Sequence, residues 1–212
     1  MERLKAIVKL IPPYDYFADI GCDHGYLIKL AFEAGIKKAQ AIDNKVKPLQ
    51  NAQNNLINFQ NNVEFSLSDG LSKLNSDIEC IVLAGLGGLA IKQILNKTPE
   101  KLGKIKRIIT SPHKNVAEVR LFLSNRGFCI VSEQVIYEDG QYYEIIVFDK
   151  GYCAYNEAEI IFGPLNLLQK SPTWLKMWTD YLSILEKVKH KDAIKKYEYI
   201  KKYVLPKGGK ND

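Results

Sequence analysis

Short apolar runs alternate with helix-like segments through most of the chain. Five runs are apolar on both faces and rich in β-branched or aromatic residues, which predicts buried strands at 17–20, 38–43, 63–67, 80–84 and 107–111. Between them, helical spacing of apolar positions predicts helices near 26–34, 47–58, 89–95 and 116–125. Gly35 and Gly127 follow two of these segments, where a left-handed cap favours glycine. The alternation predicts an α/β fold with parallel strands and helices on both faces of the sheet.

The pattern changes after the fifth strand. Residues 128–136 and 142–148 have the pattern of two further strands, joined through Glu138-Asp139-Gly140-Gln141. An Asp-Gly pair between two such runs is typical of a β-hairpin. Five parallel strands followed by an antiparallel pair are typical of the Rossmann-like class I methyltransferase fold, whose sheet is mostly parallel and seven-stranded.

The last quarter of the chain has a different composition. After Gly151 helix-forming residues and lysine dominate, and apolar positions recur at spacings of three and four from Trp174 to Val188 and again from Ile194 to Val204. We interpret these stripes as two helices folded back on each other in an antiparallel coiled-coil hairpin, with one long helix as the alternative. The expected division is a methyltransferase domain at 1–153 and a small C-terminal helical coiled-coil domain at 154–212.

Composition narrows the class of protein. Hydrophobic residues make up 46% and charged residues 25% of the 212, as in ordinary globular proteins. No apolar run approaches the ~18–20 residues that span a bilayer, and residues 1–10 lack the apolar core of a signal peptide. We therefore expect a cytoplasmic protein. The formal net charge of +6 favours anionic partners, nucleic acid among them.

The cysteines and histidines suggest no metal chemistry. Cys22, Cys80, Cys129 and Cys153 are scattered, without the paired spacing of zinc ligands, and the three histidines lie far apart in sequence. We expect neither a metal site nor a disulfide framework.

The strongest local motif is Asp19-Ile20-Gly21-Cys22-Asp23-His24-Gly25, which follows the first strand and precedes the first predicted helix. Doubly wound sheets bind nucleotide-like ligands at this position, and glycine lets the backbone approach a ligand closely. Dinucleotide sites hold an anionic pyrophosphate at a helix N-terminus, whereas S-adenosylmethionine carries a cationic amino group and a sulfonium. The carboxylate of Asp19, and that of Asp23, suits this cofactor better. The alternative is that Asp19 only caps the turn.

Two further acids follow the next strands. Asp43 and the adjacent Asn44 end the second strand, where a carboxylate accepts both ribose hydroxyls of an adenosine-containing cofactor. Asp69-Gly70 follows the third strand, where an acid accepts the adenine amine. An ordinary Asp-Gly turn is the alternative there.

The fourth strand leads into a glycine-rich segment, Ala84-Gly85-Leu86-Gly87-Gly88. The Asn/Asp-Pro-Pro-Tyr/Phe segment of many amino-group methyltransferases is absent. Three glycines favour a close backbone approach to the methyl donor and the target base, or else serve only a tight strand–helix turn.

Taken together, the motifs resemble the bacterial tRNA (adenine(22)-N1)-methyltransferases. The resemblance rests on residues 18–27, 84–88 and 138–146 and on Phe162-Gly163-Pro164 ahead of a helical tail, and it covers essentially the whole chain. Two departures stand out: Leu86 replaces the usual methionine of the glycine motif, and Ser111-Pro112-His113 replaces a Gln-Pro-Asn segment. The resemblance implies methyl transfer from S-adenosyl-L-methionine to N1 of adenine 22 in tRNA, by a Rossmann-like domain with a C-terminal coiled-coil domain.

The candidate site residues fall into three groups. For the cofactor we expect Asp19, Gly21, Cys22, Gly25, Asp43, Asn44, Asp69, Gly70 and Gly85. For catalysis we name Asp23, as an acceptor for the target base or the cofactor amine, and His24, as a proton relay or merely a capping residue. For the substrate we name Tyr26, Gly87, His113, Tyr143, Lys187, Lys191, Lys195 and Lys196. A core position on its strand is the alternative for Tyr143.

Lysines concentrate in the tail. Positions 186–202 contain seven lysines against three acidic residues, interleaved with tyrosines, as in a stripe that tracks phosphates or in a solvated helix face. We expect tRNA as the partner and a monomer without membrane or metal. Methylation of another RNA or DNA base or a small molecule, and a non-catalytic RNA-binding Rossmann-like module, are the competing functions.

Overall fold

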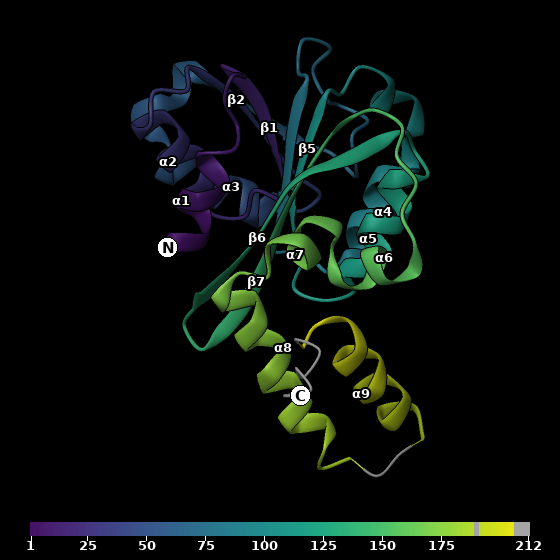
Figure 1. The fold of residues 1–212 in the computed structure, drawn as a ribbon. Helices are drawn as coiled ribbons and strands as arrows, with labels where there is room; N and C mark the ends of the chain where they lie inside the picture. The colour runs from purple at the N-terminus through teal and green to yellow at the C-terminus, as the bar shows by residue number, and fades with distance from the viewer. Residues whose placement is uncertain (189–190, 206–212) are drawn as a thin grey trace, which may run out of the picture.

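The computed structural model describes residues 1–188 and 191–205, with side chains omitted at 191–192. A seven-stranded sheet lies between two layers of helices, and a further pair of helices, α8 (Pro172–Leu185) and α9 (Lys191–Tyr203), follows at the C-terminal end of the chain (Figure 1). In chain order the strands are β1 (Tyr16–Ile20), β2 (Lys38–Asp43), β3 (Val63–Leu67), β4 (Cys80–Ala84), β5 (Arg107–Ser111), β6 (Phe128–Glu138) and β7 (Gln141–Lys150).

The helices are α1 (Glu2–Val8), α2 (Tyr26–Glu33), α3 (Val46–Asn55), α4 (Gly88–Lys97), α5 (Val116–Ser124), α6 (Glu157–Phe162), α7 (Pro164–Gln169), α8 (Pro172–Leu185) and α9 (Lys191–Tyr203). Two short 3-10 helices, η1 (Ile57–Asn62) and η2 (Pro99–Gly103), lie before β3 and β5. None of the described helices has the length and apolar composition of a bilayer-crossing segment.

The sheet has the expected methyltransferase topology. Its order is β3-β2-β1-β4-β5-β7-β6, with β7 antiparallel to both of its neighbours and the first five strands parallel. Helices α1, α2 and α3 cover one face through a core that includes Phe17 and Val82. Helices α4 and α5 cover the other face through a core that includes Leu83 and Phe148. Four of the five parallel strands begin and end where the sequence predicts them, and β1 begins one residue earlier.

The predicted hairpin is present and longer than expected. Asp139 and Gly140 form a two-residue turn with φ values of 50° and 78°, so that both central residues have the positive φ of a type I′ turn. Pairing extends from Phe128 with Lys150 to Glu138 with Gln141. The hairpin therefore reaches from the sheet toward the C-terminal helices, as Figure 1 shows.

The hairpin also brings two cysteines together, contrary to the expectation from their spacing. Cys129, at the start of β6, forms a disulfide bond with Cys153, and their Cα atoms lie 5.4 Å apart. The two are 24 residues apart in sequence, but β7 returns beside β6 and Gly151 donates to the carbonyl of Gly127. Antiparallel return, rather than sequence spacing, creates this pair.

The C-terminal segment contains two separate helices, so the alternative of one long helix is wrong. Helix α8 ends at Leu185 and α9 begins at Lys191. Their apolar sides share a core with Val135 of β6 and with Phe162. Coiled-coil packing between α8 and α9, and the domain boundary between residues 153 and 154, stay predictions.

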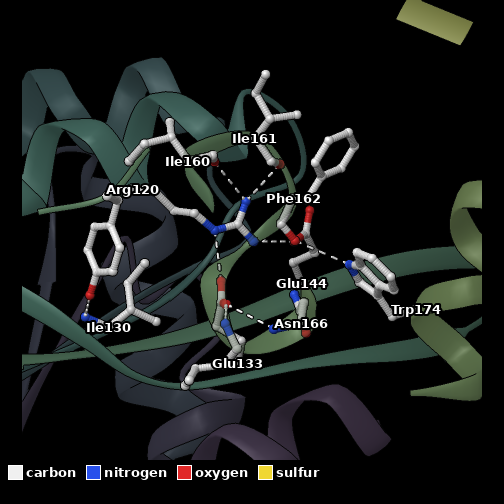
Figure 2. Close-up of polar contacts among 11 residues, drawn as sticks. Arg120, Ile130, Glu133, Glu144, Ile160, Ile161, Phe162, Asn166 and Trp174 are labelled. Atoms are coloured by element: carbon white, nitrogen blue, oxygen red, sulfur yellow. Dashed lines mark hydrogen bonds and ion pairs between the residues drawn. The ribbon is translucent and has the colours of Figure 1, made fainter. Parts of the chain in front are cut away.

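A buried ionic cluster joins this segment to the main sheet (Figure 2). Arg120 of α5 is fully buried, and its Nε donates to Glu133 Oε1 of β6 at 2.8 Å while its Nη2 donates to Glu144 of β7. Its Nη1 donates to the carbonyls of Ile160 and Ile161 at the end of α6, at 3.3 and 3.2 Å. Every nitrogen of this guanidinium therefore has a partner.

The same cluster fixes the loop before α7. The other Glu133 oxygen accepts the backbone N–H groups of Leu165 and Asn166 at 3.0 and 3.3 Å. Gly163 passes so close that a Cβ there would lie 2.5 Å from the Glu133 oxygens. The indole N–H of Trp174 donates to the Phe162 carbonyl at 3.3 Å, which ties α8 to this loop. The Phe-Gly-Pro segment is thus a structural joint around a buried carboxylate.

Candidate active site

A cavity of about 570 Å³ opens at the carboxyl ends of the parallel strands. This is the edge at which doubly wound sheets bind nucleotide-like ligands. The predicted residues that line it are Asp19, Gly21, Cys22, Asp23, His24, Tyr26, Asp43, Asn44, Asp69, Gly70 and Gly85. Side chains that come from four different strand ends therefore share one cavity.

The loop after β1 is built around glycine conformations. Gly21 and Gly25 have φ values of 78° and 71°, and Asp23 between them also has a positive φ of 43°. The N–H groups of Gly21 and Cys22 donate to the carbonyl of Ile42 at 2.8 and 3.2 Å, which folds the loop against β2. Gly25 does not line the cavity; a Cβ there would lie 2.8 Å from Leu56 Cδ1, so this glycine lets α2 begin close to the end of α3.

Asp19 is the most unusual group in the cavity. It is only 4% exposed, yet its carboxylate has no hydrogen bond within residues 1–188 and 191–205. Burial, with the nearby carboxylates of Asp43 and Asp23, raises the pKa of Asp19 to about 7. The Asp19 side chain therefore does not cap the turn that follows it. A buried acid without a donor is instead stabilised by a cation brought into the cavity.

Cys22, also in the cavity wall, does not supply a charge. Its side chain is buried, and burial with the negative charge of Asp19 and Asp43 raises the pKa of its thiol. The thiol is therefore neutral and a poor nucleophile. Cys22 contributes shape to the cavity wall.

The acids after β2 and β3 already have partners on one side. Asp43 Oδ1 accepts the backbone N–H of Lys45 at 2.9 Å, which orients the carboxylate at the cavity and turns the chain into α3. Asp69 forms an ion pair with Lys97 of α4, and both side chains line the cavity. Asp69 is about half exposed, in contrast to Asp19.

The glycines after β4 divide between two roles. Gly85, with φ 76°, and Leu86 line the cavity. A Cβ at Gly88 would lie 2.3 Å from the Asn115 carbonyl oxygen, so Gly88 serves the close crossing of α4 over the β5–α5 loop. Gly87 does not line the cavity and lies against Lys114.

Asp23, His24 and Tyr26 form the exposed lip of the cavity. His24 Nε2 lies 3.7 Å from Asp23 Oδ1, and the rings of His24 and Tyr26 are 5.5 Å apart. Their side chains are largely accessible, which suits contact with a large substrate.

His113 and Tyr143 lie together beside the cavity rather than in its wall. Their ring centroids are 5.8 Å apart in an edge-to-face arrangement. The Nε2 of His113 lies 3.7 Å from where a Gly85 Cβ would be, so the pair adjoins the β4 end of the cavity.

Sequence reasoning missed Arg3. This residue lines the cavity from α1, a helix that the sequence patterns do not predict, and its Cζ lies 4.5 Å from the centre of the Tyr143 ring. No motif marks it, because its position depends on how α1 packs against the sheet. The amphipathic spacing of Leu4, Ile7, Val8 and Ile11 was the available signal.

The predicted lysines lie elsewhere. Lys187 and the α9 residues Lys195 and Lys196 are exposed and do not line the cavity. The Nζ of Lys196 lies 4.9 Å from the Tyr181 ring centre. Lys191 is in α9, but its side chain is outside the described part of the structure. No cluster of three metal-ligating side chains occurs among residues 1–188 and 191–205.

Comparison with known proteins gives the class and then the family. The sequence profile of the methyltransferase-domain family matches residues 1–146. A tRNA (adenine(22)-N(1))-methyltransferase of Bacillus subtilis (strain 168) is 30% identical over 192 residues, which cover 85% of this chain and 80% of that protein. Fold and cavity thus define a methyltransferase domain of the type that uses S-adenosyl-L-methionine. More narrowly, the chain belongs to the tRNA (adenine(22)-N1)-methyltransferase family.

Solved structures agree with this assignment over nearly the whole chain. TrmK of M. capricolum, in complex with S-adenosyl-homocysteine, is 30% identical with a TM-score of 0.83 and covers 96% of this chain and 97% of that one. A Streptococcus pneumoniae protein in complex with S-adenosyl-L-methionine is 28% identical with a TM-score of 0.91 and covers 97% and 99%. The similarity therefore includes the C-terminal helices.

Proposed function

We propose that this protein transfers the methyl group of S-adenosyl-L-methionine to N1 of adenine 22 in tRNA. The observation that carries the proposal is the buried, unpartnered Asp19 in a cavity formed by four strand ends. An ammonium group is the partner that this carboxylate lacks, and the family's cofactor carries one. In this proposal Asp43 accepts the ribose hydroxyls and Asp69 accepts the adenine amine, since both line the cavity.

The residues at the lip of the cavity act on the target base. When bound, the cofactor supplies a methyl group on a positively charged sulfur, and transfer moves this charge to the adenine. Asp23 and His24 are exposed at the lip, where a carboxylate stabilises the developing charge and accepts, directly or through the imidazole, the proton that the exocyclic amine then loses. Tyr26, His113 and Tyr143 offer faces against which an extruded base stacks.

A tritium-transfer experiment tests this function. Purified enzyme, tritiated S-adenosyl-L-methionine and a tRNA transcript with adenine at position 22 should give labelled tRNA, with the label mapped to that nucleotide. The matched control is the same transcript with guanine at position 22, which should stay unlabelled. Label at another nucleotide, or on DNA or a small molecule only, would contradict the proposed substrate.

We further propose that α8 and α9 dock the tRNA. The support is the row of exposed lysines on α9, with Lys195, Lys196, Lys201 and Lys202 all exposed and three of them against tyrosine rings. Such cations bind the phosphate backbone, and their contribution weakens as salt rises. The double variant Lys195→Gln/Lys196→Gln should raise the KM for tRNA several-fold and reduce its salt dependence.

The control for docking is Lys73→Gln/Lys104→Gln, which removes the same charge from exposed positions away from α9. If both double variants raise the KM equally, only net charge matters and α9 is not the docking surface. We propose that the monomer acts in the cytoplasm.

A further inference from the structure

The end of the β6–β7 hairpin contains residues of the 138–146 motif that the proposed chemistry does not use. Glu138 binds the backbone at the start of α1, and Glu144 binds the buried arginine of α5. Between these two acids, Tyr142 and Tyr143 contact two further parts of the molecule. The end of the hairpin is therefore a junction between elements that lie far apart in the sequence.

Tyr142 is tied to the first C-terminal helix. Its hydroxyl donates to Asp180 Oδ2 of α8 at 2.6 Å, and Lys176 Nζ donates to both oxygens of the same carboxylate at 3.0 Å. The hydrogen bond from Tyr142 and the contacts of Lys176 lower the pKa of Asp180, so the carboxylate is ionised and the tyrosine bond is charge-assisted. The ring of Tyr142 lies 4.7 Å from that of Tyr137 across the hairpin, which fixes where the hydroxyl points.

This bond restricts the direction in which α8 leaves the main sheet. The beginning of α8 is held by the hydrogen bond from the Trp174 indole to the Phe162 carbonyl. Asp180 lies about 9 Å further along the helix axis, at 1.5 Å per residue. Apolar packing against Val135 joins the same elements, but burial has no preferred direction, whereas a hydrogen bond does. Two anchors at different heights define the direction of the helix.

Tyr143 points to the opposite face of β7, because side chains alternate along a strand. Its ring lies beside His113 and under the guanidinium of Arg3, which lines the cavity. Figure 1 shows the same hairpin end beside α8. Two consecutive residues of one strand thus contact α8 and the rim of the cavity.

We propose that Tyr142 and Asp180 form a positioning pair that sets the direction of α8 relative to the cavity, so that tRNA held by α8 and α9 presents its target base at the rim. The proposal rests on the proposed function and on docking by these helices. Neither residue lines the cavity, so both act through α8. Methyl transfer requires close alignment of the reacting atoms, and a small misplacement lowers the rate steeply. The pair should therefore affect the rate of transfer more than the affinity for tRNA.

Single-turnover kinetics with tRNA bound at saturation test this role. Tyr142→Phe keeps the ring and removes the hydroxyl, so the rate of transfer should fall roughly three- to tenfold. Equilibrium affinities for tRNA and for S-adenosyl-homocysteine should stay within about twofold, because the lysines of α9 and the cavity are untouched. Asp180→Ala should cause the same loss, and Asp180→Asn, which still accepts from the hydroxyl, a smaller one. The double variant Tyr142→Phe/Asp180→Ala should be no slower than the slower single variant.

Two control variants make the same chemical changes elsewhere. Tyr152→Phe alters an exposed tyrosine just after β7, and Asp77→Asn removes an exposed acid before β4. Both should leave the rate and the two affinities unchanged. Loss of an acid by itself favours binding of RNA, so a slower Asp180→Ala enzyme cannot be explained by net charge.

Four results would overturn the proposal. An unchanged rate in Tyr142→Phe would mean that the pair does not position the substrate. Multiplied losses in the double variant would mean that the two residues act independently. Weaker tRNA binding with an unchanged rate at saturation would place Tyr142 on the RNA. A parallel loss of affinity for S-adenosyl-homocysteine would mean that the pair only maintains the fold.

Failure of the proposed function is recognised separately. If the wild-type enzyme labels no tRNA, the substrate assignment is wrong, whatever the variants do. Hydrogen exchange of the free protein then still tests the pair, because Tyr142→Phe should speed exchange of α8 amides several-fold and leave those of α2 unchanged. Unchanged exchange in α8 would show that the bond does not hold this helix.

Discussion

Two sets of buried charges in this protein differ in how they are satisfied. In the joint between α5, β6 and α6, Arg120 is fully buried, but all of its nitrogens donate to carboxylates or carbonyls (Figure 2). At the carboxyl edge of the sheet, Asp19 is nearly as buried and has no donor within the described residues, and Arg3 has a buried nitrogen without an acceptor. Both sets contain buried charged atoms, although the Arg3 side chain as a whole is only partly buried, so the burial of a charge alone does not separate the two sets.

The difference indicates what each set is for. A satisfied cluster holds secondary-structure elements together, because removing one member leaves the remaining charges buried without a partner. An unsatisfied cluster destabilises the free protein and gains its missing partners only from a ligand. Removing a charge should therefore lower the free energy of unfolding of the free protein at the satisfied cluster and raise it at the unsatisfied one.

The largest effect is expected at the joint. Arg120→Met removes the cation between Glu133 and Glu144 and leaves two buried carboxylates without it. The free energy of unfolding should fall by about 3–5 kcal/mol, as for other buried ion pairs that lose one partner. Urea denaturation measures the change. Arg126→Met, an exposed arginine just after α5, is the control and should change stability by less than about 1 kcal/mol.

Removing the charge of Asp19 should have the second-largest effect, on cofactor affinity. Asp19→Asn keeps the size of the side chain but cannot pair with an ammonium, so affinity for S-adenosyl-homocysteine should fall by roughly a hundredfold. Isothermal calorimetry measures this loss. Asp15→Asn, an exposed acid just before β1, should bind normally. Equal affinities for Asp19→Asn and the wild type would remove Asp19 from the cofactor site.

The same variant should stabilise the free protein, in contrast to Arg120→Met. The folded-state pKa of Asp19 is raised to about 7 from its ordinary 3.8, so the folded state holds this proton over that range and the unfolded state does not. Stability from this group is complete below about pH 4 and is lost as pH rises through 7. Asp19→Asn should make the free energy of unfolding depend less on pH and should raise it by on the order of 2 kcal/mol at pH 8. The gain is modest because the carboxylate faces an open cavity and not the packed core.

Denaturation curves at pH 5 and pH 8 test whether the stabilisation by Asp19→Asn grows with pH. The difference in unfolding free energy between Asp19→Asn and the wild type should be larger at pH 8. A difference that is larger at pH 5 would mean that the carboxylate has a stabilising partner in the free protein, and the contrast with the joint would disappear.

Sequence patterns predicted the parts of the molecule that depend on local order. The parallel strands are short and mostly apolar, so four of the five have the predicted limits and β1 begins only one residue earlier. The Asp139-Gly140 turn follows from residues that tolerate positive φ. The acids at the strand ends were found because parallel strands bring their carboxyl ends to one edge. Which of these acids is unpartnered could not be predicted, since Lys97 reaches Asp69 from another helix.

The features that sequence reasoning missed all depend on contacts between distant segments. Arg3 reaches the cavity because α1 packs on the sheet beside Tyr143, and Cys129 meets Cys153 because the hairpin returns. Gly163 was noticed only as part of a family motif, and its reason is the Glu133 carboxylate against which it packs. No local pattern encodes such a contact, because each partner is at least 24 residues away in the sequence.

Asp69 lies between the two extremes of the comparison, and the smallest effects are expected there. It lines the cavity, but it is about half exposed and already paired with Lys97. Exposed ion pairs contribute little, so Asp69→Asn should change the free energy of unfolding by less than about 1 kcal/mol. The asparagine oxygen still accepts from an adenine amine, so affinity for S-adenosyl-homocysteine should fall only about two- to tenfold. Calorimetry on Asp69→Asn and Asp19→Asn measures how much affinity each variant loses. A larger loss for Asp69→Asn would contradict the comparison, because it would mean that the unpartnered acid is not the one that contributes most to ligand binding.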